Sequence, residues 1–309
     1  MTSAGPAKVI VVGVGLIGGS FALALRQALR VGAVVGVGRG RANLELARQL
    51  GIVDRYRTLD EDWAAEAGDA DLVLLATPVA QFAALFGALR GKLGARTIVT
   101  DAGSTKQDVI AVARTGLGEA FARFVPAHPI AGTEHTGAAA AFAALFRDRN
   151  VVLTPLPETD PVAAASVGAL WEACGARLRT LDPATHDRIF AAVSHLPHLL
   201  AFALVDAFAS RPDAEDIFRF AASGFRDFTR IAAGSPEMWR DIAIANREAL
   251  LAEIAAFRVQ LDRVGAMVAA GDATALEGVF AHASAARRAW GSQHATDSAS
   301  VPSDGPREP

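Results

Sequence analysis

The fold is decided by the stretch Val9-Ile10-Val11-Val12-Gly13-Val14-Gly15-Leu16-Ile17-Gly18-Gly19-Ser20. Its β-branched residues predict a strand that is buried on both faces, followed by a glycine turn and the start of a helix. Gly13 allows a tight turn, Gly15 allows the backbone to approach a pyrophosphate, and Gly18 allows the helix to pack closely on the strand. Because a helix N-terminus offers free N–H groups to phosphates, we expect a dinucleotide to bind here.

A membrane interpretation of the same stretch is weaker. No residue is charged between Lys8 and Arg26, and that length approaches a transmembrane span of about 20 residues. Glycines cluster in the middle of the run, which indicates a turn and not a lipid-facing helix. A basic segment and a clear cleavage site are also missing, so a signal peptide is not expected. We therefore expect a cytoplasmic protein that does not bind membranes.

Length and composition are typical of a globular protein with two domains. The chain has 309 residues, of which 51% are hydrophobic and 20% are charged, so it can bury a large core. The formal net charge of −3 gives no indication of a nucleic-acid partner. The single cysteine, Cys174, excludes an intrachain disulfide and fits a reducing compartment. We expect its thiol to be buried and structural.

Strand and helix patterns alternate along residues 8–181. Further strands are expected at Ala33–Val37, Asp71–Ala76, Thr97–Asp101, Phe124–Ala127, Asn150–Thr154 and Arg177–Leu181, with a helix at Asn43–Leu50. The alternation predicts an α/β fold with a Rossmann-type, doubly wound and mostly parallel sheet. Ligands of such sheets lie beyond the carboxyl ends of the strands. Gly13, Gly38, Thr77 and the segment Asp101–Ser104 fall at those ends.

Only helical patterns follow residue 181. Asp182-Pro183 supplies an N-cap and a first-turn proline, and we expect Pro197 to kink the helix that follows. Ser235-Pro236 starts another helix, and a last one runs from Asp272 to about Trp290. Between them, apolar residues alternate in steps of four and three at Leu250, Ile254, Phe257, Leu261, Val264 and Val268.

This heptad-like seam predicts a facing helix. We expect residues 182–290 to form an all-helical domain that binds substrate and makes a homodimer, although a helical bundle packed only on itself is an alternative. Residues 8–181 are expected to form the dinucleotide-binding domain. Residues 1–7 are expected to be a flexible N-terminus, and residues 291–309 a disordered tail.

The second expected strand bears on the choice of cofactor, because it ends in Gly38-Arg39-Gly40-Arg41. A site for NAD usually has an acidic residue about 20 residues past the glycines, where it accepts a hydrogen bond from the ribose. No acidic residue occurs here before Glu45. Arg39 and Arg41 would attract a 2′-phosphate, so we expect NADP, with NAD as the alternative. The competing interpretation is that both arginines are solvated loop charges.

Four further segments carry residues suited to chemistry: TDAGSTK at 100–106, PAHPIAGTE at 126–134, VSHLPH at 193–198 and GFRDFTRI at 224–231. Together with GLIGGS near the N-terminus, and in this order, these motifs resemble those of the prephenate dehydrogenase family, which includes arogenate and cyclohexadienyl dehydrogenases. The resemblance covers the chain from Lys8 to about Trp290. It implies oxidative decarboxylation of prephenate to 4-hydroxyphenylpyruvate, or of arogenate to tyrosine, in tyrosine biosynthesis.

The resemblance also assigns roles to individual residues. His128 matches the family's catalytic histidine, and histidine is suited to accept a hydroxyl proton near neutral pH. Ser104 is interpreted as a helix N-cap, and the resemblance adds contacts with the substrate hydroxyl and the nicotinamide. Arg230 matches the arginine that binds a substrate carboxylate. The other expected substrate-binding residues are His198, Ser194, Thr133, Glu134 and Arg226. The expected cofactor-binding residues are Gly13, Gly15, Leu16, Ile17, Gly18, Arg39, Arg41, Thr77, Pro78 and Ser104.

Other interpretations are weaker. A metal site built from histidines and Glu134 would lack a recognised ligand spacing, so no metal is expected. A hydrolase built on Ser104 would lack the nucleophile elbow. A related β-hydroxyacid-type dehydrogenase would share the architecture, but the resemblance to such enzymes requires a catalytic lysine, which the second domain lacks. A non-enzymatic NADP-binding sensor would explain the glycine turn but not the convergence of His128, Ser104, His198 and Arg230.

Overall fold

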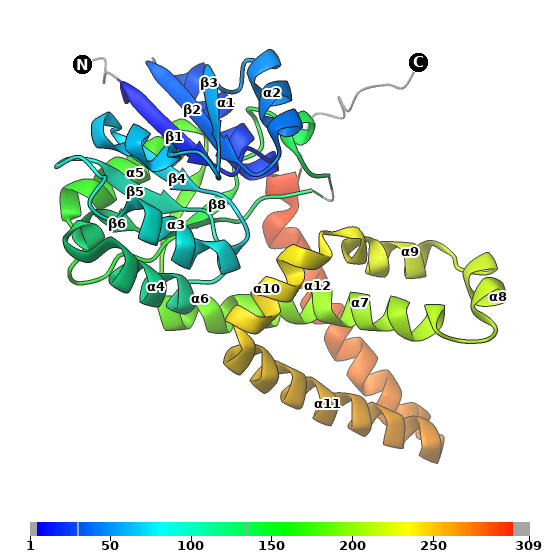
Figure 1. Cartoon of the computed structure of the whole chain (residues 1–309). Coiled ribbons are helices and arrows are strands. Elements are labelled where there is room, and N and C mark those ends of the chain that lie inside the picture. The colour runs from blue at the N-terminus through cyan, green and yellow to red at the C-terminus, as the bar shows by residue number, and fades with distance from the viewer. Residues whose placement is uncertain (1–4, 30, 134, 299–309) are drawn as a thin grey trace. The chain divides into compact units, whose positions relative to one another are not determined.

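The computed structural model describes residues 5–29, 31–133 and 135–298 (Figure 1). The chain forms two compact units, of which the first ends at Leu250 and the second begins at Leu251. The predictions for residues 1–4 and 299–309, at the two ends of the chain, lie outside the described residues.

The opening stretch forms a strand, a turn and a helix. Strand β1 (Lys8–Val12) is buried along its whole length, and helix α1 (Leu16–Ala28) begins directly after Gly15. The uncharged run between Lys8 and Arg26 is therefore not a single membrane-spanning helix.

Six parallel strands form the main sheet, in the order β3-β2-β1-β4-β5-β6. The other strands of this sheet are β2 (Ala33–Gly38), β3 (Arg55–Thr58), β4 (Leu72–Leu75), β5 (Ile98–Asp101) and β6 (Phe124–Val125), and β1 pairs with β2 and β4. The segments between them contain α2 (Arg41–Gln49), η1 (Trp63–Asp69), η2 (Val79–Gln81), α3 (Phe82–Leu89), α4 (Gln107–Leu117) and η3 (Gly118–Arg123). The strand order reverses between β1 and β4, which is where ligands bind in such sheets. The α/β prediction is confirmed, and β3 is a strand that the sequence patterns did not predict.

The side chains of β1 alternate between two hydrophobic cores, one on each face of the main sheet. Val9 and Val11 contribute to the core that includes residues of α1 and of α5 (Pro161–Ala173). Ile10 and Val12 contribute to the core that includes residues of α3 and α4. After Lys8, every position of β1 is apolar because helices cover both faces of the sheet (Figure 1).

The sequence pattern predicted one strand over residues 124–127, but the structure divides these residues between two sheets. The chain leaves the main sheet at Pro126, which has no N–H to continue the ladder. Strand β7 (Ala127–Pro129) instead pairs antiparallel with β8 (Asn150–Leu153), and β8 pairs parallel with β9 (Arg177–Thr180). A short turn, η4 (Ala138–Ala140), lies between β7 and β8. His128 therefore lies within a strand of a second sheet and not after a strand end.

The helical part of the first unit begins at Asp182, which caps α6 (Pro183–Phe190) by accepting a hydrogen bond from the Thr185 N–H at 2.9 Å. A π-helical turn, η5 (Ala191–His195), separates α6 from α7 (Leu196–Ala209). The predicted kink at Pro197 is therefore a π-helical turn that precedes this proline, which occupies the first turn of α7. The next elements are α8 (Ala214–Arg219), α9 (Ser223–Thr229), η6 (Arg230–Ala233) and α10 (Pro236–Ala245).

Helix α11 (Arg247–Ala270) starts in the first unit and continues in the second, which also contains α12 (Ala273–Ser298). Asp272 caps α12, as predicted, by accepting from the Ala275 N–H at 2.9 Å. Residues 291–298, predicted to belong to a disordered tail, are helical in α12, since no proline interrupts the helix before Pro302. Along α11, Leu261 and Val268 of the predicted seam are 57% and 62% exposed.

Candidate active site

The turn between β1 and α1 has the geometry of an anion site. Gly13 adopts a φ of +96°, and a Cβ at this position would lie 2.5 Å from the carbonyl oxygen of Ala76. A Cβ on Gly18 would lie 2.2 Å from the carbonyl oxygen of Gly13. At Gly15, by contrast, no atom of the described residues lies within 4 Å of such a Cβ, and no side chain caps α1. This open helix N-terminus fits the pyrophosphate of a dinucleotide.

The other residues predicted around the cofactor lie at the same edge of the sheet. Leu16 is buried and Ile17 is half-buried in the first turn of α1. Thr77 and Pro78 directly follow β4, the neighbour of β1, and the Thr77 nitrogen lies 2.9 Å from the Cβ position of Gly13. Ser104 follows β5, the next strand along.

Arg39 and Arg41 lie at the end of β2, but their side chains have different partners. The Arg39 guanidinium forms two hydrogen bonds of 3.1 Å with Glu237, which lies in the first turn of α10. Nη2 of Arg41 lies 3.5 Å from a carboxylate oxygen of Glu61, and its guanidinium lies 6.0 Å from the centre of the Tyr56 ring. Both arginines are exposed.

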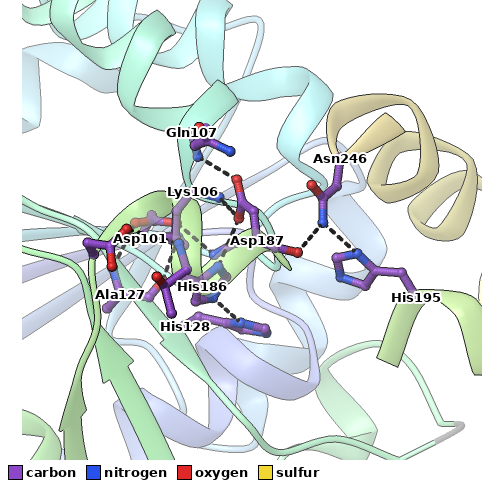
Figure 2. A network of polar contacts seen from close by, with 12 residues as sticks. Asp101, Lys106, Gln107, Ala127, His128, His186, Asp187, His195 and Asn246 are labelled. Carbon is purple, nitrogen blue, oxygen red and sulfur yellow. Dashed lines mark hydrogen bonds and ion pairs between the residues drawn. The ribbon is translucent and has the colours of Figure 1, made fainter. Parts of the chain in front are cut away.

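The TDAGSTK segment fixes the backbone of the strand that carries His128. Asp101 and Lys106 form a fully buried ion pair. Oδ1 of Asp101 accepts from the Ala127 N–H at 3.0 Å, and Nζ of Lys106 donates to the Ala127 carbonyl oxygen at 2.7 Å. Both backbone groups of the residue before His128 are therefore bound by this pair (Figure 2). A buried ion pair is costly unless further hydrogen bonds satisfy its polar atoms. The Ala127 backbone supplies one such bond to each member of this pair.

Ser104 does not cap the next helix, contrary to the prediction. Helix α4 begins at Gln107, and its N-terminus is bound by the carboxylate of Asp187 from α6. The N–H of Lys106 donates to Oδ1 at 2.8 Å and that of Gln107 donates to Oδ2 at 2.9 Å. A carboxylate is favoured at a helix N-terminus, so the half-buried Ser104 is not needed there.

A chain of side-chain hydrogen bonds determines the tautomer of His128 (Figure 2). Its Nδ1 lies 2.9 Å from Nε2 of His186, whose Nδ1 lies 2.8 Å from Oδ1 of Asp187. The carboxylate can only accept, so His186 donates from Nδ1 and its Nε2 is the acceptor when the ring is neutral. His128 must then donate from Nδ1. Its Nε2 therefore carries the lone pair.

Burial favours the neutral form of His128 and His186, and hydrogen bonds favour the ionised form of Asp187. Burial lowers the pKa of His128 well below the usual range of histidine, and positive charge at His186 and Lys106 lowers it further. Burial also lowers the pKa of His186, although its hydrogen bond to Asp187 opposes the shift. Burial opposes the charge of Asp187, but hydrogen bonds from His186 and two backbone N–H groups outweigh it and lower the pKa of Asp187. The Phe190 ring centre, 4.8 Å from that of His128, adds to this apolar environment.

Residues from the helical part form a second group around His198. Nδ1 of His198 donates to the Ser194 carbonyl oxygen at 2.9 Å, and its ring stacks on Trp239 with centroids 3.6 Å apart. Burial lowers the pKa of His198; the Ser194 carbonyl opposes this shift, and the charge of Arg230 adds to it. Arg230 itself is exposed at the start of η6. The predicted residues His198, Ser194 and Arg230 thus lie near one another.

Three predicted substrate-binding residues remain, namely Thr133, Arg226 and Glu134. Thr133 is exposed, and its hydroxyl accepts from the His135 N–H at 3.3 Å. Arg226 is exposed on α9. Glu134 lies outside the described residues.

Sequence reasoning missed the residues that support His128. His186 and Asp187 are almost fully buried, and Asn246 is also buried, with Nδ2 2.8 Å from the Asp187 carbonyl oxygen and 3.1 Å from Nδ1 of His195. This places His195 in the supporting network, where burial lowers its pKa to about 4. A histidine and an aspartate side by side on an apolar helix were the available signal. Their partner could not be found without the fold, because 58 positions separate His186 from His128.

Comparison with known proteins assigns both halves of the chain. Residues 21–180 match the nucleotide-binding domain of prephenate dehydrogenase, and residues 182–282 match the prephenate dehydrogenase dimerization domain.

Individual relatives agree along nearly the whole length. The cyclohexadienyl dehydrogenase of Zymomonas mobilis is 33% identical over 288 residues, which cover 93% of this chain and 97% of the relative. A crystal structure of Aquifex aeolicus prephenate dehydrogenase with hydroxyphenyl propionate and NAD+ is similar with a TM-score of 0.85 and 35% identity, covering 93% of this chain and 99% of that one. Arogenate dehydrogenase of Synechocystis has a TM-score of 0.74 and 30% identity, covering 92% and 99%. The chain thus belongs to the prephenate dehydrogenase family of NAD(P)-dependent oxidoreductases.

Proposed function

We propose that this protein catalyses the oxidative decarboxylation of prephenate, arogenate or both, with NADP as the cofactor, in tyrosine biosynthesis. The observation that carries the proposal is the hydrogen-bond chain from His128 through His186 to Asp187. It leaves the lone pair of a neutral imidazole on Nε2, which is what a base for a carbinol hydroxyl requires.

The proton changes place twice in the proposed reaction. Nε2 of His128 accepts the hydroxyl proton as the ring carbon that bears the hydroxyl loses a hydride. This carbon and its oxygen then form a ketone. The bond to the ring carboxylate then breaks, carbon dioxide leaves, and the bonding electrons make the ring aromatic as a phenolate. The proton returns from His128 to the phenolate oxygen, so no proton is gained or lost overall. Asp187 stabilises the transient positive charge on the two imidazoles.

Substrate binding requires fixed positive charge, because prephenate carries two carboxylates. Arg230 is proposed to bind one of them through its guanidinium fork, next to His198. Ser194, Thr133, Glu134 and Arg226 are proposed as further substrate contacts, and Ser104 as a contact to the substrate hydroxyl. Trp239 fixes the His198 ring by stacking on it.

The cofactor is proposed to bind over Gly13, Gly15 and Gly18, with its pyrophosphate at the α1 N-terminus. Leu16, Ile17, Thr77, Pro78 and Ser104 would line the same edge. When bound, the nicotinamide supplies the hydride acceptor. Arg39 and Arg41 support NADP in preference to NAD, because arginine attracts the 2′-phosphate and β2 ends without an acidic residue.

Residues 8–181 are proposed as the dinucleotide-binding domain and residues 182–290 as the substrate and dimerisation domain. The run Pro183–Ala209 is long and apolar enough to cross a membrane by length and composition alone, and 28% of its apolar 18-residue window is buried. We propose a cytoplasmic homodimer, in which a second copy covers apolar surface of the C-terminal helices. The dimerisation domain of the family supports this arrangement.

The test is steady-state kinetics with prephenate and arogenate, each with NAD+ and NADP+, followed by the absorbance of the reduced cofactor. Turnover of one or both substrates, with carbon dioxide released in equal amount and a higher kcat/KM with NADP+, is expected. A higher kcat/KM with NAD+ would contradict the cofactor assignment alone. Cofactor binding without turnover of either substrate would contradict the proposed activity and favour a sensor.

A further inference from the structure

Glu237 brings a carboxylate from the helical part of the first unit to the end of β2. Its Oε1 and Oε2 each lie 3.1 Å from a different terminal nitrogen of Arg39, although 198 positions separate the two residues. The hydrogen bonds and charge of Arg39 lower the pKa of Glu237, so the carboxylate is ionised at neutral pH. Glu237 also lies in the first turn of α10, where the helix favours negative charge.

Arg39 is one of the two arginines that the proposed function assigns to the 2′-phosphate of NADP, and Arg41 is the other. A guanidinium binds phosphate through the same pair of parallel N–H groups that it uses for a carboxylate. The two terminal nitrogens of Arg39 are both engaged with Glu237. A 2′-phosphate at Arg39 would therefore displace Glu237, or would lie beside a negative charge that repels it.

We propose that Glu237 is a specificity-determining residue for the cofactor: it competes with the 2′-phosphate for Arg39 and thereby weakens binding of NADP relative to NAD. The proposal rests on the proposed function, because it requires that Arg39 be the phosphate ligand. Glu237 thereby places a negative charge beside the end of β2, where the sequence itself has no acidic residue before Glu45.

The expected magnitude is modest. The side chains of Arg39 and Glu237 are 62% and 41% exposed, and ion pairs in such surroundings are weak and screened by salt. A phosphate can therefore displace the carboxylate, and removing the charge of Glu237 changes affinity by a few-fold and not by orders of magnitude.

The experiment measures the dissociation constants of NADP+ and NAD+ for the full chain by titration calorimetry at low salt. Glu237→Gln is expected to tighten NADP+ binding about fivefold and to change NAD+ binding less than about twofold. Glu215→Gln is the matched control, because Glu215 is an exposed carboxylate of α8 that pairs with Arg219. It removes the same charge without touching Arg39 and should leave the ratio of the two constants unchanged.

Arg39→Gln separates this proposal from the proposed cofactor. It is expected to weaken NADP+ binding, and adding Glu237→Gln to it should give no further gain. If Glu237→Gln leaves the NADP+ to NAD+ ratio unchanged while Arg39→Gln lowers NADP+ affinity, only the competition is overturned. If Arg39→Gln leaves NADP+ affinity unchanged, both the competition and the assignment of Arg39 to the phosphate are overturned.

Discussion

The imidazole of His128 is held by two further side chains, and each of them adds a distinct constraint. His186 accepts from Nδ1 of His128, and Asp187 fixes the tautomer of His186. Asp187 is fixed in turn by the N–H groups at the start of α4. The N–H groups of Lys106 and Gln107 thus fix the orientation of His128, the proposed base, through Asp187 and His186.

Replacing Asp187 by Asn tests this orientation. An amide can donate to Nδ1 of His186, which would move the proton of His186 to Nε2 and leave His128 with its proton on Nε2, where the base is blocked. We expect kcat to fall by about 10²- to 10⁴-fold with NADP+ affinity nearly unchanged. Asp206→Asn, an exposed aspartate on α7, is the control. A kcat within threefold of the parent, in a variant with unchanged circular dichroism, would contradict the assigned tautomer.

The pH dependence of kcat/KM follows from the same environment. Only the neutral form of His128 can accept the proton, and its pKa lies well below the usual value of about 6.5. The acid limb of the profile should therefore lie below pH 6.5, with a plateau through neutral pH. Prephenate turnover measured from pH 4.5 to 8 checks this. An acid limb centred above pH 7 would show that His128 is not buried as a neutral base.

At the scale of elements, the β1 and α1 pattern was predictable because its glycines and β-branched residues act locally. The helix caps at Asp182, Ser235 and Asp272 were predictable for the same reason. By contrast, β3 reads Arg-Tyr-Arg-Thr at the edge of the sheet and has no buried apolar run to reveal it. The transfer of β7 to a second sheet depends on pairing with β8, which lies more than 20 residues later, so it could not be read locally.

Two glycines of the turn should respond differently to alanine. In Gly18→Ala, the new Cβ would lie 2.2 Å from a backbone carbonyl oxygen, so we expect a loss of about 1–3 kcal/mol in the free energy of unfolding. In Gly15→Ala, the Cβ meets no atom of the described residues within 4 Å, so stability should be nearly unchanged. Cofactor affinity should fall in Gly15→Ala because the methyl group would oppose close approach of the pyrophosphate. Urea unfolding and calorimetry separate the two effects, and unchanged affinity in Gly15→Ala would contradict the pyrophosphate site.

At the scale of the whole molecule, the sequence predicted one half with nucleotide-binding features and one half with substrate-binding residues, and the family comparison agrees. The supporting residues His186, Asp187 and Asn246 could not be predicted, because their roles depend on contacts between elements far apart in sequence. The helical seam was readable as a period, but its partner was not; Leu261 and Val268 are exposed in the single chain, and we propose that a second copy covers them.

A charge in this seam should separate the dimer. Leu261→Glu places a carboxylate at an exposed apolar position of α11, and burying it against a second copy would cost several kcal/mol. We expect sedimentation equilibrium to show monomers at concentrations where the parent is dimeric. Gln260→Glu adds the same charge beside the seam and should stay dimeric. If both variants remain dimeric, α11 is not in the interface.

A neutral His128 is proposed to remove the hydroxyl proton during oxidative decarboxylation. The most direct measurement is the single-turnover rate of NADP+ reduction by prephenate in the His128→Asn variant, with the NADP+ dissociation constant measured alongside. We expect a rate lower by about 10²- to 10⁴-fold, because asparagine cannot accept the proton, and an NADP+ affinity within twofold of the parent. A rate close to that of the parent would contradict it.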